Sequence, residues 1–351
     1  MATLAQAIRL ALHYGEEHLG VTDIFGEDVG APLGGVFTCT QGLKTAWNSP
    51  LDERGIVAAA LGIAYAGGKP VAEIQFCDYI YNVIDLMKLC GNAHWSSAGE
   101  YHVPMVLMTP VGAGIHGSMY HSHSFESMAT HIQGWKIVIP SNAKDAYGLM
   151  LSAIADPNPV LFMAPKGLMR VKGEEPIPGA PHDERLLHQM IDAPVGDRSH
   201  WEPRWPELQD YRVPIGEAKI TRPGADLTVV SYGRLLGVCN QAADQLRGEG
   251  IAAEVIDLRT LYPFDETTVF ESVRKTGRLI VVNEDTEITN FGEHVIRRVT
   301  DECFYDLLAP PKLVAGLDVP GVGLAWGYEK HSIPQPDGIL AAMRALAQLQ
   351  A

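Results

Sequence analysis

A glutamate at the start of an apolar stretch is the first residue of this chain whose type and position could support acid–base chemistry. Glu53 lies in SPLDERGIVAAALGIA (49–64). Ser49 or Asp52 could cap a helix here, and an acidic residue in its first turn favours the helix dipole. Alternatively, so apolar a helix is buried on most sides, which would leave Glu53 partly desolvated and able to donate a proton. From the residues alone, the capping role is favoured.

A group of histidines is the second candidate for chemistry. It consists of His116, His121, His123 and His131. The group follows an apolar segment that is typical of a parallel strand, and open α/β sheets bind ligands at the carboxyl ends of such strands. Three interpretations compete, namely polar loop residues, proton-handling residues and metal ligands. We rank them in that order, because a metal site needs three or four convergent ligands and no HExxH pattern is present.

A glycine-rich segment precedes these histidines. GAGIHG (112–117) matches the GxGxxG pattern of dinucleotide-binding folds. The polar residues that follow it do not open an apolar helix, and no acidic residue ends a strand about 20 residues later. A glycine-rich turn is therefore favoured, with a nicotinamide-binding protein as an alternative. The chain has no GxxxxGK[ST] motif, which argues against a P-loop nucleotide site.

The elements that must position these residues alternate strand with helix. Apolar, β-branched runs predict strands at 21–25, 69–74, 103–109, 135–140 and 159–165, and helices near 54–67, 78–93 and 142–155. The alternation returns with strands at 225–233, 252–258, 277–285 and 311–318, and helices near 234–249, 265–276, 290–304 and 337–349. Strands that are apolar throughout are typical of parallel sheets covered on both faces. The pattern predicts an α/β protein with two doubly wound, mostly parallel-sheet domains.

The alternation stops between the two halves. Residues 171–214 hold seven of the 23 prolines, and proline fixes φ and removes a hydrogen-bond donor, so little regular structure is expected there. Trp201 and Trp205 indicate that this segment lies against a surface, either its own or a partner's. We expect a first α/β domain at 1–170, a connector at 171–214 and a second domain at 215–351.

Composition excludes several classes of function. The formal net charge of −15 argues against nucleic acid and anionic membranes as partners, because both attract cationic surfaces. No apolar run reaches the roughly 18 residues of a membrane span. The amphipathic N-terminal pattern lacks the features of a signal peptide, so we expect a cytoplasmic location. Five cysteines without a CxxC pair indicate neither a disulfide framework nor a zinc site.

Eight segments, in order along the chain, together resemble one family. They are FGEDVG (25–30), GGVFTCTQGL (34–43), SPLDERGIVAAALG (49–62), AEIQFCDYIY (72–81), GSMYHSHSFESM (117–128), KIVIPSNAKDAYGLMLSAI (136–154), VIDLRTLYPFD (255–265) and KTGRLIVVNED (275–285). The family is the β subunit of the thiamine-diphosphate-dependent 2-oxo acid dehydrogenases, the decarboxylating component of the branched-chain and pyruvate dehydrogenase complexes. The resemblance implies a thiamine-diphosphate pyrimidine-binding domain followed by a transketolase C-terminal-like domain.

The resemblance also implies a binding pocket for the aminopyrimidine ring of the cofactor. Glu53 matches the glutamate that bonds this ring and promotes the imino tautomer, which takes the thiazolium proton. Leu51, Gln75 and Tyr79 match positions that line the pocket, and Tyr79 or Phe76 would supply an aromatic face. On their spacing alone, these aromatic residues would be assigned to the core.

Two further roles follow from the resemblance. His121 matches a histidine that contacts the substrate carboxylate or the intermediate and passes protons during acylation of a lipoyl group. Two residues later the family usually has glutamine, where this chain has His123, a difference that could alter substrate contacts or pH dependence. The family can also bind potassium through loop carbonyls, at positions that match Val103, Met105, Ala153, Asp156 and Asn158.

A missing motif predicts a partner. Related enzymes bind magnesium and the cofactor diphosphate through a GDG motif that this chain lacks, and a diphosphate needs a cation and backbone donors. In the family, an α subunit supplies them within an α2β2 heterotetramer, which acylates a lipoyl-bearing acyltransferase core. We therefore predict the β subunit of a 2-oxo acid dehydrogenase, active only with its α subunit. A branched-chain substrate is favoured over pyruvate or acetoin, and a non-catalytic scaffold subunit is the remaining alternative.

Overall fold

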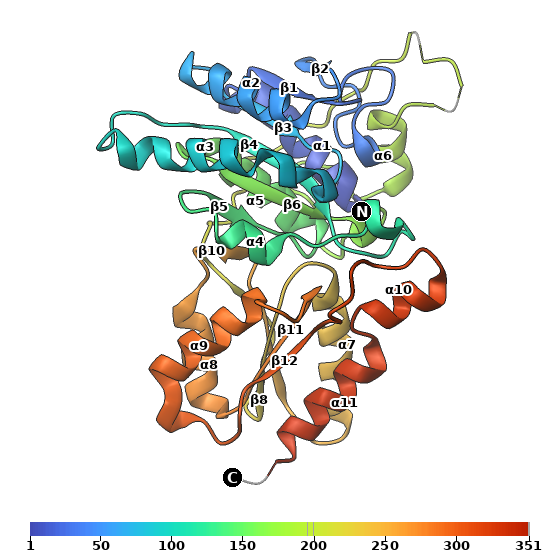
Figure 1. Cartoon of the computed structure of the whole chain (residues 1–351). Coiled ribbons are helices and arrows are strands. Elements are labelled where there is room, and N and C mark those ends of the chain that lie inside the picture. The colour runs from blue at the N-terminus through green and yellow to red at the C-terminus, as the bar shows by residue number, and fades with distance from the viewer. Residues whose placement is uncertain (195, 199, 350–351) are drawn as a thin grey trace. The chain divides into compact units, whose positions relative to one another are not determined.

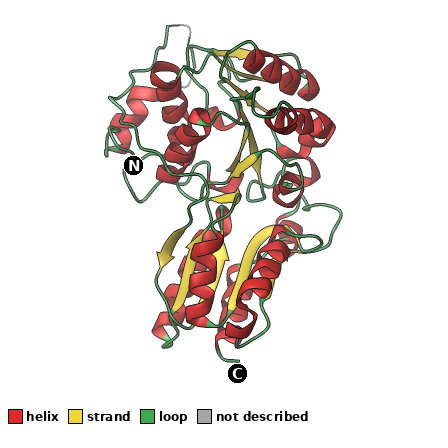
Figure 2. Ribbon diagram, turned by 90° about the vertical axis from the view of Figure 1, so that its left-hand side faces the viewer, coloured by secondary structure: helices red, strands yellow, loops and turns green. Residues whose placement is uncertain are grey.

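The computed structural model describes residues 1–194, 196–198 and 200–349 (Figure 1). They form two compact units, of which the first comprises 1–110 and 132–215, and the second comprises 111–131 and the residues from 216 onward. Both units have mostly parallel sheets with helices packed on them (Figure 2), which confirms the predicted fold class. Positions 195 and 199 of the expected connector, and 350–351 of the expected second domain, lie outside the described residues.

The first unit is built on a sheet whose strands follow the order β5-β6-β4-β3-β1-β2. They are β1 (Asp23–Gly26), β2 (Ala46–Asn48), β3 (Pro70–Glu73), β4 (Val106–Val111), β5 (Lys136–Val138) and β6 (Val160–Pro165). β3, β4 and β6 are buried along their whole length, which explains their continuous apolar runs. The sequence analysis missed β2, because this three-residue edge strand is largely exposed and gives no apolar run.

The helices of the first unit are α1 (Leu4–Tyr14), α2 (Glu53–Tyr65), α3 (Ile84–Ser96), α5 (Ala143–Ala155) and α6 (Glu184–Ile191). Shorter helical segments are η1 (Gly15–Leu19), η2 (Val36–Thr38), η3 (Cys77–Val83) and η5 (Lys166–Leu168). α1 packs against α5, and α2 packs against α3. No helix in the described part of the chain has both the length and the apolarity to cross a membrane.

The expected connector contains more regular structure than its prolines predict. α6 occupies the proline-free interval between Pro181 and Pro194, and the side chain of Asp183 caps its first turn. The prediction of little regular structure was wrong for this interval, because proline breaks a helix only where it interrupts one. Further along, Trp205 stacks on His13 with ring centroids 4.1 Å apart, against the core of the first unit. This contact confirms that the connector lies against a surface of its own chain.

The second unit has a sheet with the order β12-β11-β8-β9-β7. The strands of this sheet are β7 (Lys219–Arg222), β8 (Leu227–Ser231), β9 (Ala253–Asp257), β11 (Leu279–Thr286) and β12 (Lys312–Gly316). The second unit also contains β10 (Thr260–Tyr262), which is not part of this sheet. Its helices are α4 (Glu126–Thr130), α7 (Arg234–Gly248), α8 (Glu266–Thr276), α9 (Phe291–Cys303), α10 (Trp326–Ser332) and α11 (Pro336–Ala347), with η4 (Ser118–Tyr120) and η6 (Phe304–Asp306). β7, which the sequence analysis missed, pairs antiparallel with β9 at the edge of the sheet and is only partly buried.

The histidine-rich segment 111–131 belongs to the second unit, where two carboxylates at the end of β11 bind its backbone. Glu284 accepts a hydrogen bond from the N–H of Ala113 at 3.1 Å. Asp285 accepts hydrogen bonds from both the N–H and the hydroxyl of Ser127, at 3.0 and 2.6 Å. Polar residues at the carboxyl end of a parallel strand therefore fix the course of this segment.

Replacing Ser127 by alanine should destabilise the second unit. The change removes one hydrogen bond from buried Asp285 and the acceptor of the Phe291 N–H, 2.9 Å from the Ser127 hydroxyl. We expect Ser127→Ala to lower the free energy of unfolding by about 1–3 kcal/mol, measured by denaturant unfolding of the purified chain. Ser96→Ala, at an exposed serine, is the control. Equal stability of the two variants would contradict the assigned role.

Arg9 joins three parts of the first unit. Its side chain is 1% exposed, and its guanidinium donates to the carbonyl and hydroxyl oxygens of Thr38, at 2.9 and 3.1 Å. It also donates to the carbonyl of Ile191 at 2.6 Å and to the carboxylate of Asp192 at 2.8 Å. Burial lowers the pKa of Arg9, and the nearby Asp192 carboxylate opposes this effect. Arg9 thus ties α1 to the loop at η2 and to the end of α6.

Breaking this network should cost more than an ordinary surface substitution. Arg9→Met removes the guanidinium donor of two carbonyl groups and of one Asp192 oxygen, while the Gln6 amide still donates to the other Asp192 oxygen at 2.7 Å. With three acceptors deprived of this donor, we expect a loss of about 3–5 kcal/mol in the free energy of unfolding. Chemical denaturation of the purified chain measures it. Arg212→Met, which removes an exposed arginine paired with Asp210, serves as the control and should have a much smaller effect. Similar losses in both variants would refute the special role of Arg9.

Candidate functional site

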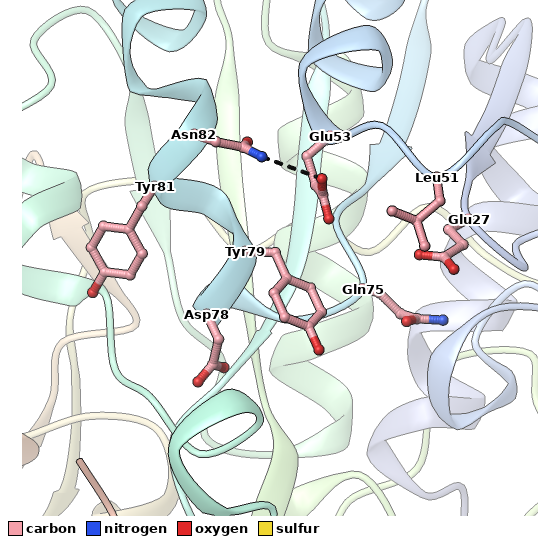
Figure 3. A pocket seen from close by; sticks show the side chains of 8 residues that line it. All are labelled: Glu27, Leu51, Glu53, Gln75, Asp78, Tyr79, Tyr81 and Asn82. Atoms are coloured by element: carbon pink, nitrogen blue, oxygen red, sulfur yellow. Dashed lines mark hydrogen bonds between the residues drawn. The ribbon is translucent and has the colours of Figure 1, made fainter.

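A cavity of about 560 Å³ opens in the first unit near the carboxyl ends of β1 and β3 (Figure 3). Its walls come from the residue after β1, the start of α2, and the stretch from the end of β3 through η3. The lining residues are Glu27, Leu51, Glu53, Gln75, Asp78, Tyr79, Tyr81 and Asn82. Four residues expected at the site, Leu51, Glu53, Gln75 and Tyr79, are therefore brought together by the fold.

Glu53 is half-buried at the first position of α2, and its Oε2 accepts a hydrogen bond from the side-chain amide of Asn82 at 3.4 Å (Figure 3). Asp52 occupies the N-cap position, but its side chain makes no capping hydrogen bond. The hydroxyl of Ser49 donates to the carbonyl of Pro50 instead. Asp52 as the N-cap residue and Glu53 in the first turn are thus confirmed, but the capping hydrogen bond is absent, and the Glu53 carboxylate faces the cavity (Figure 3).

The apolar helix that begins at Glu53 is less buried than expected. Ile56, Val57, Ala60 and Ala64 are its buried residues, whereas Ala58, Ala59, Gly62 and Tyr65 are exposed. The prediction that α2 is buried on most sides was wrong. Alanine and glycine present little apolar area, so a helix rich in them can leave one face in solvent at small cost.

A bidentate ion pair joins α2 to the segment that carries Asn82. Arg54 donates to both carboxylate oxygens of Asp85, at 2.6 and 2.9 Å, and to the carbonyl of Asn82 at 2.9 Å. The hydrogen bond from Arg54 holds the pKa of Asp85 below its usual value. The pair is exposed and adds little stability, but its fork geometry fixes the position of Asn82 beside Glu53.

The two aromatic candidates occupy different places. Tyr79 lines the cavity, and burial raises the pKa of its hydroxyl, with a further contribution from Asp78. Phe76 packs edge-on behind Tyr79, with centroids 6.1 Å apart, and does not itself line the cavity. The buried ammonium group of Lys166 lies 5.5 Å from the centre of the Phe76 ring and 3.8 Å from the Asp78 carboxylate. Of these two candidates, Tyr79 is therefore the one whose ring a flat ligand in the cavity would meet.

Sequence reasoning did not single out Glu27, Asp78, Tyr81 or Asn82 as cavity residues. The signal for Glu27 was present, because it directly follows a strand and the carboxyl ends of parallel strands form ligand sites. Asn82 is a polar residue in an otherwise apolar run, but its closeness to Glu53 depends on how η3 packs against α2. That packing cannot be read from spacing.

His121 and His123 lie in the second unit, on segment 111–131, and both are half-buried. The carbonyl of His123 accepts a hydrogen bond from the N–H of Gly112 at 2.7 Å. Gly112 and Gly114 have φ values of 81° and 103°, and the helical segment that follows has only three residues. This confirms the predicted glycine-rich turn. The described residues contain no cluster of three His, Cys, Asp or Glu side chains that could hold a metal.

The positions matched to a potassium site lie in the first unit. Val103 and Met105 precede β4, Ala153 lies in the last turn of α5, and Asp156 and Asn158 follow α5. The Asp156 carboxylate pairs with the ammonium of Lys136 and accepts the N–H of Asn158 at 2.9 Å. The carbonyls of Val103 and Met105 each accept one backbone hydrogen bond, at 2.8 and 3.0 Å. Each carbonyl keeps a second lone pair, so backbone oxygens fit a cation here better than the Asp156 side chain does.

Two family models match the chain. The model described as "Transketolase, pyrimidine binding domain" matches residues 3–172, and "Transketolase, C-terminal domain" matches residues 216–339. Among solved structures, a split-gene transketolase, described as an inactive beta4 tetramer, superimposes with a TM-score of 0.73 over 100% of both chains at 17% identity. This likeness concerns the fold.

Relatives of similar length are closer in sequence. The 2-oxoisovalerate dehydrogenase subunit beta of Pseudomonas aeruginosa is 37% identical, over 99% of this chain and 95% of that protein. The Bacillus subtilis protein of the same name is 35% identical over 97% of both chains. The pyruvate dehydrogenase E1 component subunit beta of Acholeplasma laidlawii is 36% identical over 99% and 98%. The chain therefore belongs to the family of 2-oxo acid dehydrogenase β subunits, built from transketolase pyrimidine-binding and C-terminal domains.

Proposed function

We propose that this chain is the β subunit of a branched-chain 2-oxo acid dehydrogenase, which decarboxylates a 2-oxo acid and passes the acyl group to a lipoyl group. The observation that carries the proposal is the half-buried carboxylate of Glu53 in a cavity with an amide, an aromatic ring and an apolar side chain. Pyruvate is the alternative substrate, because a relative named for it is as similar to this chain as those named for 2-oxoisovalerate.

The cavity residues fit the aminopyrimidine ring of thiamine diphosphate. Tyr79 and Leu51 offer apolar surface for a flat ring, while Gln75 and Glu53 offer hydrogen-bonding groups for its nitrogens. When bound, the cofactor supplies the carbon nucleophile and the electron sink of the reaction. Glu53 would hold a proton at a pyrimidine nitrogen, and Asn82 would keep the Glu53 carboxyl in place through its amide.

Exposed apolar residues of the first unit support a partner subunit. Leu51, which lines the cavity just before α2, is 70% exposed, and Leu89 and Trp95 on α3 are 57% and 84% exposed. A chain that buries these residues against a partner removes apolar area from water. We propose that the partner is an α subunit, in an α2β2 assembly, and that it supplies the magnesium and diphosphate binding that the missing GDG motif would provide.

We propose further roles for the histidines of segment 111–131 and for the loop carbonyl groups near Asp156. His121 would contact the substrate or the acyl intermediate and move protons, with His123 beside it in sequence modulating that role. A potassium ion would bind through the carbonyl groups near Asp156, and the lipoyl-bearing acyltransferase core would be the second partner. The expected cytoplasmic location stays a prediction.

Replacing Glu53 by glutamine tests the catalytic part of the proposal. Glu53→Gln keeps a polar side chain but loses the acid, so turnover of 2-oxoisovalerate by the reconstituted complex should fall by at least about 100-fold. Glu100→Gln, at an exposed glutamate, is the control and should leave turnover near the wild-type value. Unchanged turnover in Glu53→Gln would favour a scaffold subunit. Comparing 2-oxoisovalerate with pyruvate in the wild-type complex identifies the substrate.

Cofactor binding by the isolated chain tests the need for a partner. We expect calorimetric titration of the chain alone with thiamine diphosphate and magnesium to give weak binding, because a diphosphate needs a cation and backbone donors. Adding the α subunit should produce tight, magnesium-dependent binding. Tight binding and decarboxylation by the chain alone would refute the proposed division of the site. A parallel titration with a nicotinamide dinucleotide tests the alternative that GAGIHG (112–117) marks a nicotinamide-binding protein.

A further inference from the structure

A second carboxyl group, that of Glu73, is buried two residues before Gln75 of the cavity. Glu73 is the last residue of β3 and is 2% exposed. Its Oε1 accepts a hydrogen bond from the N–H of Val36 at 3.3 Å, whereas its Oε2 has no hydrogen-bond partner. A Cβ atom at Gly35 would lie 3.5 Å from both oxygens, so the loop after β1 packs directly on this group.

The same loop reaches a residue of the cavity. Gly35 donates its N–H to the carbonyl of Asp28 at 2.8 Å, and the Asp28 carboxylate accepts a hydrogen bond from the Gln75 side chain at 3.4 Å. Asp28 and Phe37 have φ values of 60° and 57°, a conformation that costs energy in residues other than glycine. The packing at Glu73 is therefore one of the contacts that hold the loop in this shape, together with the hydrogen bonds from Arg9 to Thr38.

The electrostatic surroundings of Glu73 favour its neutral form. Burial raises the pKa of Glu73 to about 8, and the Asp28 carboxylate adds to this rise against the opposing Val36 N–H. The Cys39 thiol also faces it, and burial together with Glu73 raises the pKa of that thiol to about 12. Two arginines, Arg9 and Arg170, act on Cys39 but do not contribute to the shift of Glu73.

We propose that Glu73 is a positioning residue, whose buried carboxyl group holds Gln75 in the cavity through the loop residue Asp28. Burying a neutral carboxyl group away from water costs less free energy than burying an ionised one. An ionised Glu73 would also place a second negative charge beside Asp28. The repulsion would displace Asp28 and the loop, and Gln75 would lose its hydrogen bond. This inference rests on the proposed function for one point, the identity of the ligand that Gln75 contacts.

Stability against pH tests the inference on the chain itself. Unfolded, Glu73 releases its proton above its ordinary pKa near 4.5, while the folded chain keeps it up to about 8. Stability due to this group is therefore present at low pH and lost as pH rises from about 5 to 8. We therefore compare the equilibrium constants for folding of the wild type and of Glu73→Gln. The constant of the wild type divided by that of Glu73→Gln should fall by about tenfold per pH unit in this window and be constant above it.

Two further variants make the result interpretable. Glu174→Gln, at an exposed glutamate, should run parallel to the wild type at every pH. Glu73→Ala removes the acceptor of the Val36 N–H, so it should be less stable than Glu73→Gln by an amount that does not vary with pH. Parallel stability curves for wild type and Glu73→Gln would overturn the inference, because no proton would then be bound at Glu73 on folding.

The reconstituted complex tests the link to the cavity. As Glu73 ionises, the wild-type KM for thiamine diphosphate should rise by up to about tenfold between pH 8 and 9. In Glu73→Gln, the ratio of KM at pH 9 to KM at pH 7 should approach one. The same alkaline rise in both would overturn the positioning role of Glu73. A complex that turns over no 2-oxo acid would refute the proposed function, while the stability measurement would still decide the state of Glu73.

Discussion

The close pairing of β1 with β3 is the constraint on which the candidate site depends. Gly26 lies opposite Glu73 in the parallel register, and a Cβ atom at Gly26 would come within 2.4 Å of the Glu73 carbonyl. Only glycine permits this approach. The carbonyl of Gly26 also accepts a hydrogen bond from the N–H of Ser49 at 3.0 Å. This bond places the residues that lead into α2 beside the ends of β1 and β3. Three segments far apart in sequence thereby open onto one cavity.

Two carboxyl groups near this point experience different environments. Glu53 stands at the mouth of the cavity, half-buried, with an amide partner from Asn82. Glu73 is sealed beneath the loop, where burial favours its neutral form. A fold that holds similar groups in unlike surroundings can give them unlike tasks. Here one carboxyl group faces the ligand space, and the other governs the shape of the wall around it.

The cavity is suited to one part of the proposed cofactor. The cavity offers hydrogen-bonding groups and apolar surface suited to a flat ring, but nothing in the sequence corresponds to the motif that binds a diphosphate through magnesium. Leu51 and Trp95 are exposed apolar residues that the proposed partner would cover. Membership in the family of 2-oxo acid dehydrogenase β subunits implies a complex with an α subunit, which agrees with the proposed division of the cofactor site.

The sequence by itself determined the α/β class, because continuous apolar runs mark strands that are buried on both faces. It also determined the family, because eight matching segments occur in order. It did not reveal β2 and β7, which are edge strands without apolar runs, or α6, which lies between prolines. Tertiary structure alone decided that Phe76 packs behind Tyr79, that Asn82 meets Glu53, and that Glu73 is sealed. Hydrogen-bond partners and desolvation come from residues distant in sequence, so spacing along the chain carries no record of them.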